Sequence, residues 1–351
     1  MANDPQIPWS DEQWARANQV VQEESKRARV AATFLPLYGP LDADADFVRR
    51  QDIFYSEPAT TREAAAEEIN TARQQYHDAL RGRWEGAEPN YADAFEAQAR
   101  IARAQAILGR RRLGIDDRDT MRLATLQVLV PVRNAQMVDP EMTSVLALFR
   151  RAANVIARLE DAVVFRGLAR DPANLGQFAP RGGLGGLPRI WRITGAQDAP
   201  GLWSPAGRRL REVRAWPQDQ RGHQIVAAVS GAIGDLEQDG HFGPFAVILG
   251  QGLFLVAQTP DVGSLVMPQD RIIPFLGGGP LLRSSTLDEF GGNSGVVVAL
   301  GGSPVELVIA TDMSLQFIQV TEEPTFIFRV CEKIALRIRE PDAIVLLYMQ
   351  P

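Results

Sequence analysis

The sequence has very few residues of the types that cross-link chains or act as amine nucleophiles. Among its 351 residues there is one cysteine, Cys331, so no disulfide can form within the chain. Only two of the 37 basic residues are lysines, Lys26 and Lys333, which leaves almost no candidate for Schiff-base chemistry. The positive charge is therefore almost wholly arginine, a planar and permanently ionised group suited to bidentate pairing across interfaces.

The sequence also lacks an excess of basic residues and a long apolar run. Its net charge of −6 at pH 7 excludes the basic footprint that phosphate-neutralising nucleic-acid binders carry. The longest apolar stretches, residues 244–257 and 343–349, are interrupted or far shorter than the roughly 20 residues that a membrane helix needs. Residues 1–10 have no apolar core of a secretory signal, so we expect no nucleic acid or membrane partner and a cytoplasmic location.

No metal or cofactor site is predicted. Asp42, Asp44 and Asp46 alternate as in a calcium loop, but Phe47 stands where such a loop has glycine and Ile53 where it has glutamate. The three histidines of the chain do not supply a convincing metal cluster. The interpretation of the three aspartates is therefore a solvated acidic turn.

One serine invites a catalytic interpretation. Gly292-Asn293-Ser294-Gly295 looks like the nucleophile loop of trypsin-like serine proteases, which need a histidine base. His223 and His241 both precede Ser294 too closely to leave room for the usual barrel half, and His77 lies in a helical segment. A turn before the apolar strand at 296–300 is favoured, and a serine hydrolase centred on Ser294 is kept as an alternative.

Helical patterns dominate the first half of the chain. Ser10 and Gln13 form a capping box that predicts a helix over about 11–32, whose small apolar residues indicate shallow docking. Residues 60–112 carry two thin apolar stripes separated at 86–90, which predicts a helical hairpin that must pack on its own chain or on a neighbouring subunit.

The second half has a mixed pattern. Residues 123–132 are strand-like, and Asp139 is predicted as the N-cap of a long helix that ends near Arg166 and carries acidic residues late in its apolar face. Short strands, a helix over 223–238 and the long strand 325–338 follow. The fold class predicted is α+β.

Three blocks of sequence, in order, carry a resemblance. Residues 9–40 begin Trp-Ser-Asp-Glu-Gln-Trp and end Gly-Pro, and residues 129–167 end Leu-Glu-Asp-Ala-Val-Val-Phe-Arg-Gly. Residues 243–349 begin Gly-Pro-Phe and contain Asp-Met-Ser-Leu at 312–315 and Glu-Pro-Asp-Ala-Ile at 340–344. In this combination the chain resembles the encapsulins, nanocompartment shell proteins of the linocin-like family that share the Hong Kong 97-type phage capsid fold.

The resemblance implies a P-domain, an A-domain and an E-loop, to which this chain adds an inserted helical hairpin. The implied regions are 1–40 (N-terminal lumenal helix and linker), 41–120 (E-loop region with the inserted hairpin), 121–221 (P-domain with spine helix and connector), 222–310 (A-domain) and 311–351 (return through the P-domain with the final strand). Some family members bind flavin through a tryptophan, but the corresponding position here is Met121, so we expect no cofactor.

The resemblance also implies a function: a self-assembling subunit of an icosahedral shell that encloses a cargo enzyme through a targeting peptide. A phage or prophage major capsid protein is the alternative within this fold. The implied cargo-binding residues are Trp14, Val21, Phe34, Leu35, Ile309, Asp312, Leu315 and Phe317, and the implied pore residue is Asp261. The predicted subunit-interface residues of the hairpin are Ile69, Tyr76, Leu80 and Phe95.

Overall fold

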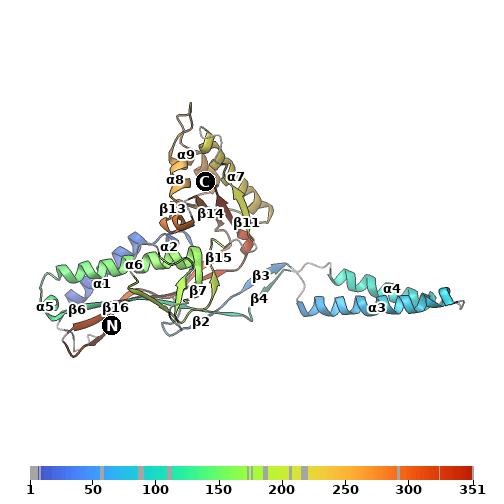
Figure 1. The fold of residues 1–351 in the computed structure, drawn as a ribbon, viewed down its shortest axis with the longest axis horizontal. Coiled ribbons are helices and arrows are strands. Elements are labelled where there is room, and N and C mark those ends of the chain that lie inside the picture. Colours follow the sequence, from blue (N-terminus) through green and yellow to red (C-terminus); the bar gives the residue numbers. More distant parts are fainter. Residues whose placement is uncertain are drawn as a thin grey trace. The chain divides into compact units, whose positions relative to one another are not determined.

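The structure is a computed structural model that describes residues 7, 9–55, 59–85, 91–108, 113–171, 174, 177–184, 189–204, 208–214, 220–290, 293–323 and 325–349 (Figure 1). The chain divides into two compact units. The larger unit comprises Met1–Arg50 and Asp119–Pro351, and the smaller unit comprises Gln51–Arg118. None of the described helices is long and apolar enough to cross a membrane.

An eight-stranded sheet forms the base of the larger unit. Its strand order is β1 (Leu37–Tyr38), β15 (Val305–Val320), β16 (Thr325–Ile338), β6 (Ala124–Arg133), β9 (Trp191–Thr194), β8 (Phe178–Pro180), β7 (Gly167–Arg170) and β10 (Ala199–Pro200). All neighbouring pairs are antiparallel except β1 and β15. The sequence patterns at 123–132 and 325–338 therefore predicted two central strands of this sheet.

The long helix α6 (Thr143–Arg166) lies along this sheet, with α5 (Asn134–Met137) before it (Figure 1). Phe149, Ile156 and Leu159 on its apolar face are fully buried. The N-cap is Met142 and not Asp139 as predicted. The Asp139 carboxylate still accepts hydrogen bonds from the backbone N–H groups of Glu141 and Thr143, because the chain makes a turn before the helix begins.

Helix α1 (Asp11–Ala28) runs beside α6 (Figure 1). The predicted capping box is present: the Gln13 N–H donates to Ser10 Oγ, and the Ser10 N–H donates to Gln13 Oε1. The helix ends at Ala28 and not near residue 32, because the chain becomes extended at Arg29 before the short helix α2 (Ala31–Phe34) begins. This break directs Arg29 into the protein.

A five-stranded sheet forms the rest of the larger unit. Its order is β11 (Arg209–Glu212), β17 (Ile344–Tyr348), β14 (Ser294–Ala299), β12 (Phe245–Leu249) and β13 (Leu281–Arg283). Alternate residues of its central strands face two cores: Val296 packs in the core around α6, and Val297 packs in the core around α7 (Arg221–Gln238). Burial on both faces explains why these strands are continuously apolar. The remaining short elements are α8 (Gln251–Gln258), α9 (Pro268–Ile272), η2 (Ile273–Leu276), η3 (Ser285–Phe290) and η4 (Pro341–Ala343).

The smaller unit contains the segment predicted to form a helical hairpin. Its helices α3 (Ala59–Glu85) and α4 (Tyr91–Leu108) pack against each other, and β3 (Asp52–Tyr55) pairs with β4 (Leu113–Asp116). Ile69 contacts alanines at a small core, and Arg100 binds Glu68 between the helices at 2.6 Å. In the larger unit, β2 (Phe47–Arg49) pairs with β5 (Thr120–Arg122).

Candidate functional site

Aromatic side chains join the start of α1 to α6 and the eight-stranded sheet. The Trp9 ring stacks on Phe328 with their centroids 5.0 Å apart, and Phe317 meets Phe328 edge-on at 5.7 Å. Trp14 lies 6.0 Å from the same ring, and Trp9 Nε1 donates a hydrogen bond to the Met137 carbonyl at 3.2 Å. Trp9 and Phe328 are buried, whereas Trp14 and Phe317 are only half-buried. The cluster therefore presents two aromatic side chains to its surroundings.

A buried group of charges lies at the other end of α1. The Arg29 guanidinium lies 2.8 Å from Glu332 of β16, 2.9 Å from Asp312 of β15 and 3.6 Å from Glu160 of α6. Glu160 and Glu332 are both fully buried, and neither Glu160 oxygen has a hydrogen-bond partner among the described residues. One cation thus holds carboxylates from three elements.

Burial is the main cause of the raised pKa values of the carboxyl groups near Arg29. It raises the pKa of Glu332 to about 7, opposed by the Arg29 guanidinium, and raises that of Glu160 well above its usual range, assisted by the nearby Glu332. Burial likewise raises the pKa of Asp161 to about 7, although its carboxylate accepts hydrogen bonds from the Val30 and Ala31 N–H groups. Sequence patterning placed Glu160 and Asp161 in the apolar face of the long helix, but it did not predict that Arg29 and Glu332 would join them.

The structure divides the predicted cargo-binding residues into two sets. Val21, Phe34, Leu35, Ile309 and Leu315 are buried, and Phe34 stacks on Phe165 at 6.3 Å. These five side chains pack within their own subunit, and their contact with cargo stays a prediction. Trp14, Asp312 and Phe317 remain accessible, and Asp312 already pairs with Arg29.

The predicted pore residue lies in the loop between α8 and α9. The Asp261 carboxylate accepts the Gly222 N–H at 2.8 Å, in the first turn of α7. The side chains beyond it are strongly exposed, Val262 at 85% and Leu265 at 102%. Asp261 therefore has a role within the subunit, and the loop leaves apolar side chains uncovered.

The predicted interface residues of the smaller unit differ in exposure. Ile69 is buried between the two helices, Tyr76 is half-buried, and Phe95 is 75% exposed. The side chain of Leu80 lies outside the described part of the structure. The two helices therefore do not bury Phe95 between them, and its burial at a contact with another subunit stays a prediction.

The geometry around Ser294 does not favour nucleophilic catalysis. Ser294 is buried in β14, and its hydroxyl donates a hydrogen bond to the Leu287 carbonyl at 2.8 Å. His223 lies beside Arg271, and His241 lies beside Asp342. The Ser294 hydroxyl is therefore hydrogen-bonded to a backbone carbonyl, whereas the serine of a protease is hydrogen-bonded to the imidazole that acts as its base.

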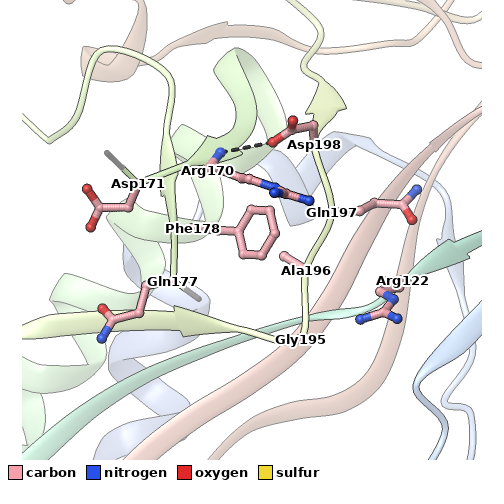
Figure 2. Close-up of a pocket in the computed structure, with 9 residues that line it drawn as sticks. All are labelled: Arg122, Arg170, Asp171, Gln177, Phe178, Gly195, Ala196, Gln197 and Asp198. Carbon is pink, nitrogen blue, oxygen red and sulfur yellow. Dashed lines mark hydrogen bonds between the residues drawn. The ribbon is translucent and has the colours of Figure 1, made fainter. Parts of the chain in front are cut away.

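A cavity of about 580 Å³ opens beside β7, β8 and β9. Figure 2 shows the Phe178 ring in the middle of its lining, with Arg122 and Arg170 on different strands. The Arg170 N–H donates to Asp198 at 2.9 Å, and Asp171 pairs with Arg189. Two arginines and two aspartates balance in charge, so the cavity favours no class of charged ligand.

A family profile and a curated relative match the sequence of this chain. Residues 194–335 match the profile of the family described as "Encapsulating protein for peroxidase". A curated relative, the type 1 encapsulin shell protein EncA of Myxococcus xanthus (strain DK1622), is 25% identical over 343 residues, which cover 96% of this chain and 92% of that protein. The chain is therefore similar to encapsulin shell proteins.

The match to the encapsulin family profile has defined limits. It begins at the end of β9 and continues into β16, so it includes β15, most of β16 and every strand of the five-stranded sheet except β17. It leaves out α1, α6 and the smaller unit.

A solved structure supports the fold described above. The crystal structure of a virus-like particle from Pyrococcus furiosus has a TM-score of 0.53 at 12% identity, covering 96% of this chain and 99% of that one. The chain therefore has the α+β fold of Hong Kong 97-type capsid proteins, as its sequence blocks predicted.

Proposed function

We propose that this chain is the subunit of a closed shell that assembles from copies of itself and encloses a cargo protein. The observation that carries the proposal is the similarity to a type 1 encapsulin shell protein over nearly the full length of both chains. The fold shared with a virus-like particle supports it. The family description names a peroxidase as the enclosed protein, so a peroxidase is the first cargo to test.

The parts of the fold correspond to the parts of a capsid subunit. We assign the eight-stranded sheet with α6 to the P-domain and the five-stranded sheet with α7, α8 and α9 to the A-domain. The strands β2 to β5 correspond to an E-loop, into which α3 and α4 are inserted. A shell subunit needs surfaces that meet other copies, and the isolated chain exposes apolar side chains in two such parts, at Phe95 and in the 262–267 loop.

The half-buried aromatic side chains of the α1 region are the proposed cargo contacts. Trp14 and Phe317 flank the buried Phe328 ring and leave part of their surface accessible. An apolar anchor of a cargo peptide would gain roughly 1.5 to 3 kcal/mol on full burial against them. Asp312 is 52% exposed beside Arg29 and would pair with a basic residue of the peptide.

The 259–267 loop is the proposed lining of a symmetry-axis pore. Repetition of Asp261 around such an axis would place a ring of carboxylates there and favour cations. The hydrogen bond from Gly222 supports this placement, because it holds the carboxylate in one position. Asp261→Asn should slow the uptake of metal ions by a lumenal chelator, and unchanged uptake would exclude this role.

The decisive experiment is the mass and shape of the full chain expressed alone. Light scattering and electron microscopy should show closed particles of megadalton mass with icosahedral symmetry. A monomer or small oligomer under several salt and pH conditions would overturn the proposal. Ultraviolet absorbance of purified particles separates the phage-capsid alternative, because a nucleic-acid container would carry a strong nucleic-acid spectrum.

A further inference from the structure

Three metal-ligating side chains from distant parts of the sequence meet beside the five-stranded sheet. His241 follows α7, whereas Glu340 and Asp342 lie at η4, between β16 and β17. One ligating atom of each residue lies within 4.8 Å of the other two. The sequence predicted no metal site here, because His241 lies about a hundred positions before Glu340 and Asp342 and no local pattern connects them.

The backbone holds both segments in place. Gly240 has φ +90°, and its N–H donates to the Glu237 carbonyl at 3.1 Å while the His241 N–H donates to the Leu236 carbonyl at 2.8 Å. These two bonds form a Schellman motif, which fixes the residue that follows the helix. At the other segment, the Glu340 N–H donates to the Pro304 carbonyl, and the Ala343 N–H donates to the Glu340 carbonyl.

The imidazole has an unused ligating atom aimed at the carboxylates. His241 is 6% exposed, and its Nε2 is buried with no hydrogen-bond partner among the described residues. Oδ1 of Asp342 lies 3.3 Å from this nitrogen and pairs with it when the imidazole is protonated, whereas the neutral imidazole leaves the nitrogen without a partner among the described residues. Buried polar atoms in native proteins normally have partners, so this nitrogen calls for an explanation.

A metal ion explains this arrangement. Ligands 2.0 to 2.2 Å from a tetrahedral zinc ion lie about 3.4 Å from one another, close to the observed separation of Nε2 and Oδ1. Small movements of the more exposed Glu340 and Asp342 side chains would complete the set. We propose that His241, Glu340 and Asp342 bind one divalent transition-metal ion, for which zinc is the probe.

The donor set selects the class of metal. One imidazole and two carboxylates suit zinc and its first-row neighbours, whereas magnesium and calcium prefer all-oxygen sites. Asp342 is 45% exposed, so the ion has a route from solvent and a coordination position remains for water.

The surrounding charges favour a cation. The Glu340 and Asp342 carboxylates each place an oxygen within 4.8 Å of a ligating nitrogen of the imidazole. The nearby Arg209 is held by Asp239 at 2.6 Å and by Asp235 at 3.4 Å. Its positive charge is therefore compensated by acidic groups that do not belong to the proposed site.

The bound ion would connect the end of α7 to the segment between the two sheets. It would stabilise the larger unit because it binds the folded site and not separated ligands. This inference does not depend on shell assembly, since all three ligands come from one chain.

Calorimetric titration of the metal-stripped full-length protein with zinc chloride at neutral pH tests the site. We expect one zinc ion to bind per chain and to raise the thermal unfolding midpoint. His241→Ala and Asp342→Asn should each weaken binding by at least about 10- to 100-fold. Cobalt substitution should give the absorption bands of a low-symmetry site in the wild type and lose them in Asp342→Asn.

His223→Ala is the matched control, because it removes a different histidine, next to Arg271, and should leave zinc affinity unchanged. Asp342→Asn changes a half-exposed side chain and keeps the test valid if His241→Ala does not fold. Absence of saturable zinc binding in the wild type, or full binding in Asp342→Asn, would overturn the proposal.

Discussion

Nη1 of Arg29 lies 2.8 Å from Oε1 of the buried Glu332, which links the end of the N-terminal helix to the central strand β16. The two residues are some three hundred positions apart in sequence. Glu160 and Asp312 share the same guanidinium. A single arginine therefore joins three elements of the larger unit.

At a pH of about 8, above the pKa of Glu332 in the folded protein, Arg29→Met should destabilise the folded subunit by about 3 to 5 kcal/mol, because it leaves the Glu332 carboxylate buried without its cation. Chemical denaturation of the purified protein measures this free energy. Arg27→Met is the control, since Arg27 is exposed and lies two residues before Arg29. Adding Glu332→Gln to Arg29→Met should recover part of the loss, and equal effects of the two arginine substitutions would contradict the role of Arg29.

The stability of the larger unit should fall as pH rises from about 4.5 to about 7 through the contribution of Glu332. Its pKa is near 4.5 when exposed and about 7 in the folded protein, so the folded state holds the extra proton in this window. Asp161 acts in the same direction. Urea denaturation across pH should show a flatter profile for Glu332→Gln than for the exposed control Glu23→Gln.

Ser294→Ala should leave any background hydrolysis unchanged and cost about 0.5 to 1.5 kcal/mol of stability, through loss of the hydrogen bond to Leu287. Thermal unfolding and a hydrolase assay on the same samples measure the two effects. A hydrolytic activity that disappears in the variant would restore the serine hydrolase interpretation.

Phe95→Ser should make assembled particles dissociate at lower temperature or lower denaturant concentration. The side chain is 75% exposed in the single chain, and its burial at a subunit contact would be worth roughly 1.5 to 3 kcal/mol. Gln98→Ser, at another exposed position of α4, is the control. Identical particle stability in both variants would mean that this face does not contact another subunit.

Phe317→Ala should leave particles intact but reduce cargo loading about tenfold or more when the native cargo is coexpressed, since 1.4 kcal/mol of lost affinity is a factor of ten. Ile318→Ala, at the next and 43% exposed position of β15, should load normally. Asp312→Lys should also reduce loading, and Arg29→Met distinguishes loss of the peptide contact from loss of the Arg29 pair. Full loading with Phe317→Ala would place the cargo site elsewhere.

The sequence by itself determined the local structure and the general fold. The capping box at Ser10 and the apolar pattern of 325–338 predicted α1 and β16 because such signals act between near neighbours in the chain. The start of α6 was misplaced at Asp139, because a left-handed residue at Met142 continues the turn by three residues.

Only the tertiary structure decided which side chains meet. It buried Val21 and Leu315 within the subunit, although the sequence predicted them to contact cargo, because their burial depends on how α1 packs against α6 and β15. It also placed His241 beside Glu340 and Asp342, and Arg29 beside Glu332. Local patterns encode helices and strands, whereas contacts between residues a hundred or more positions apart arise only when those elements pack.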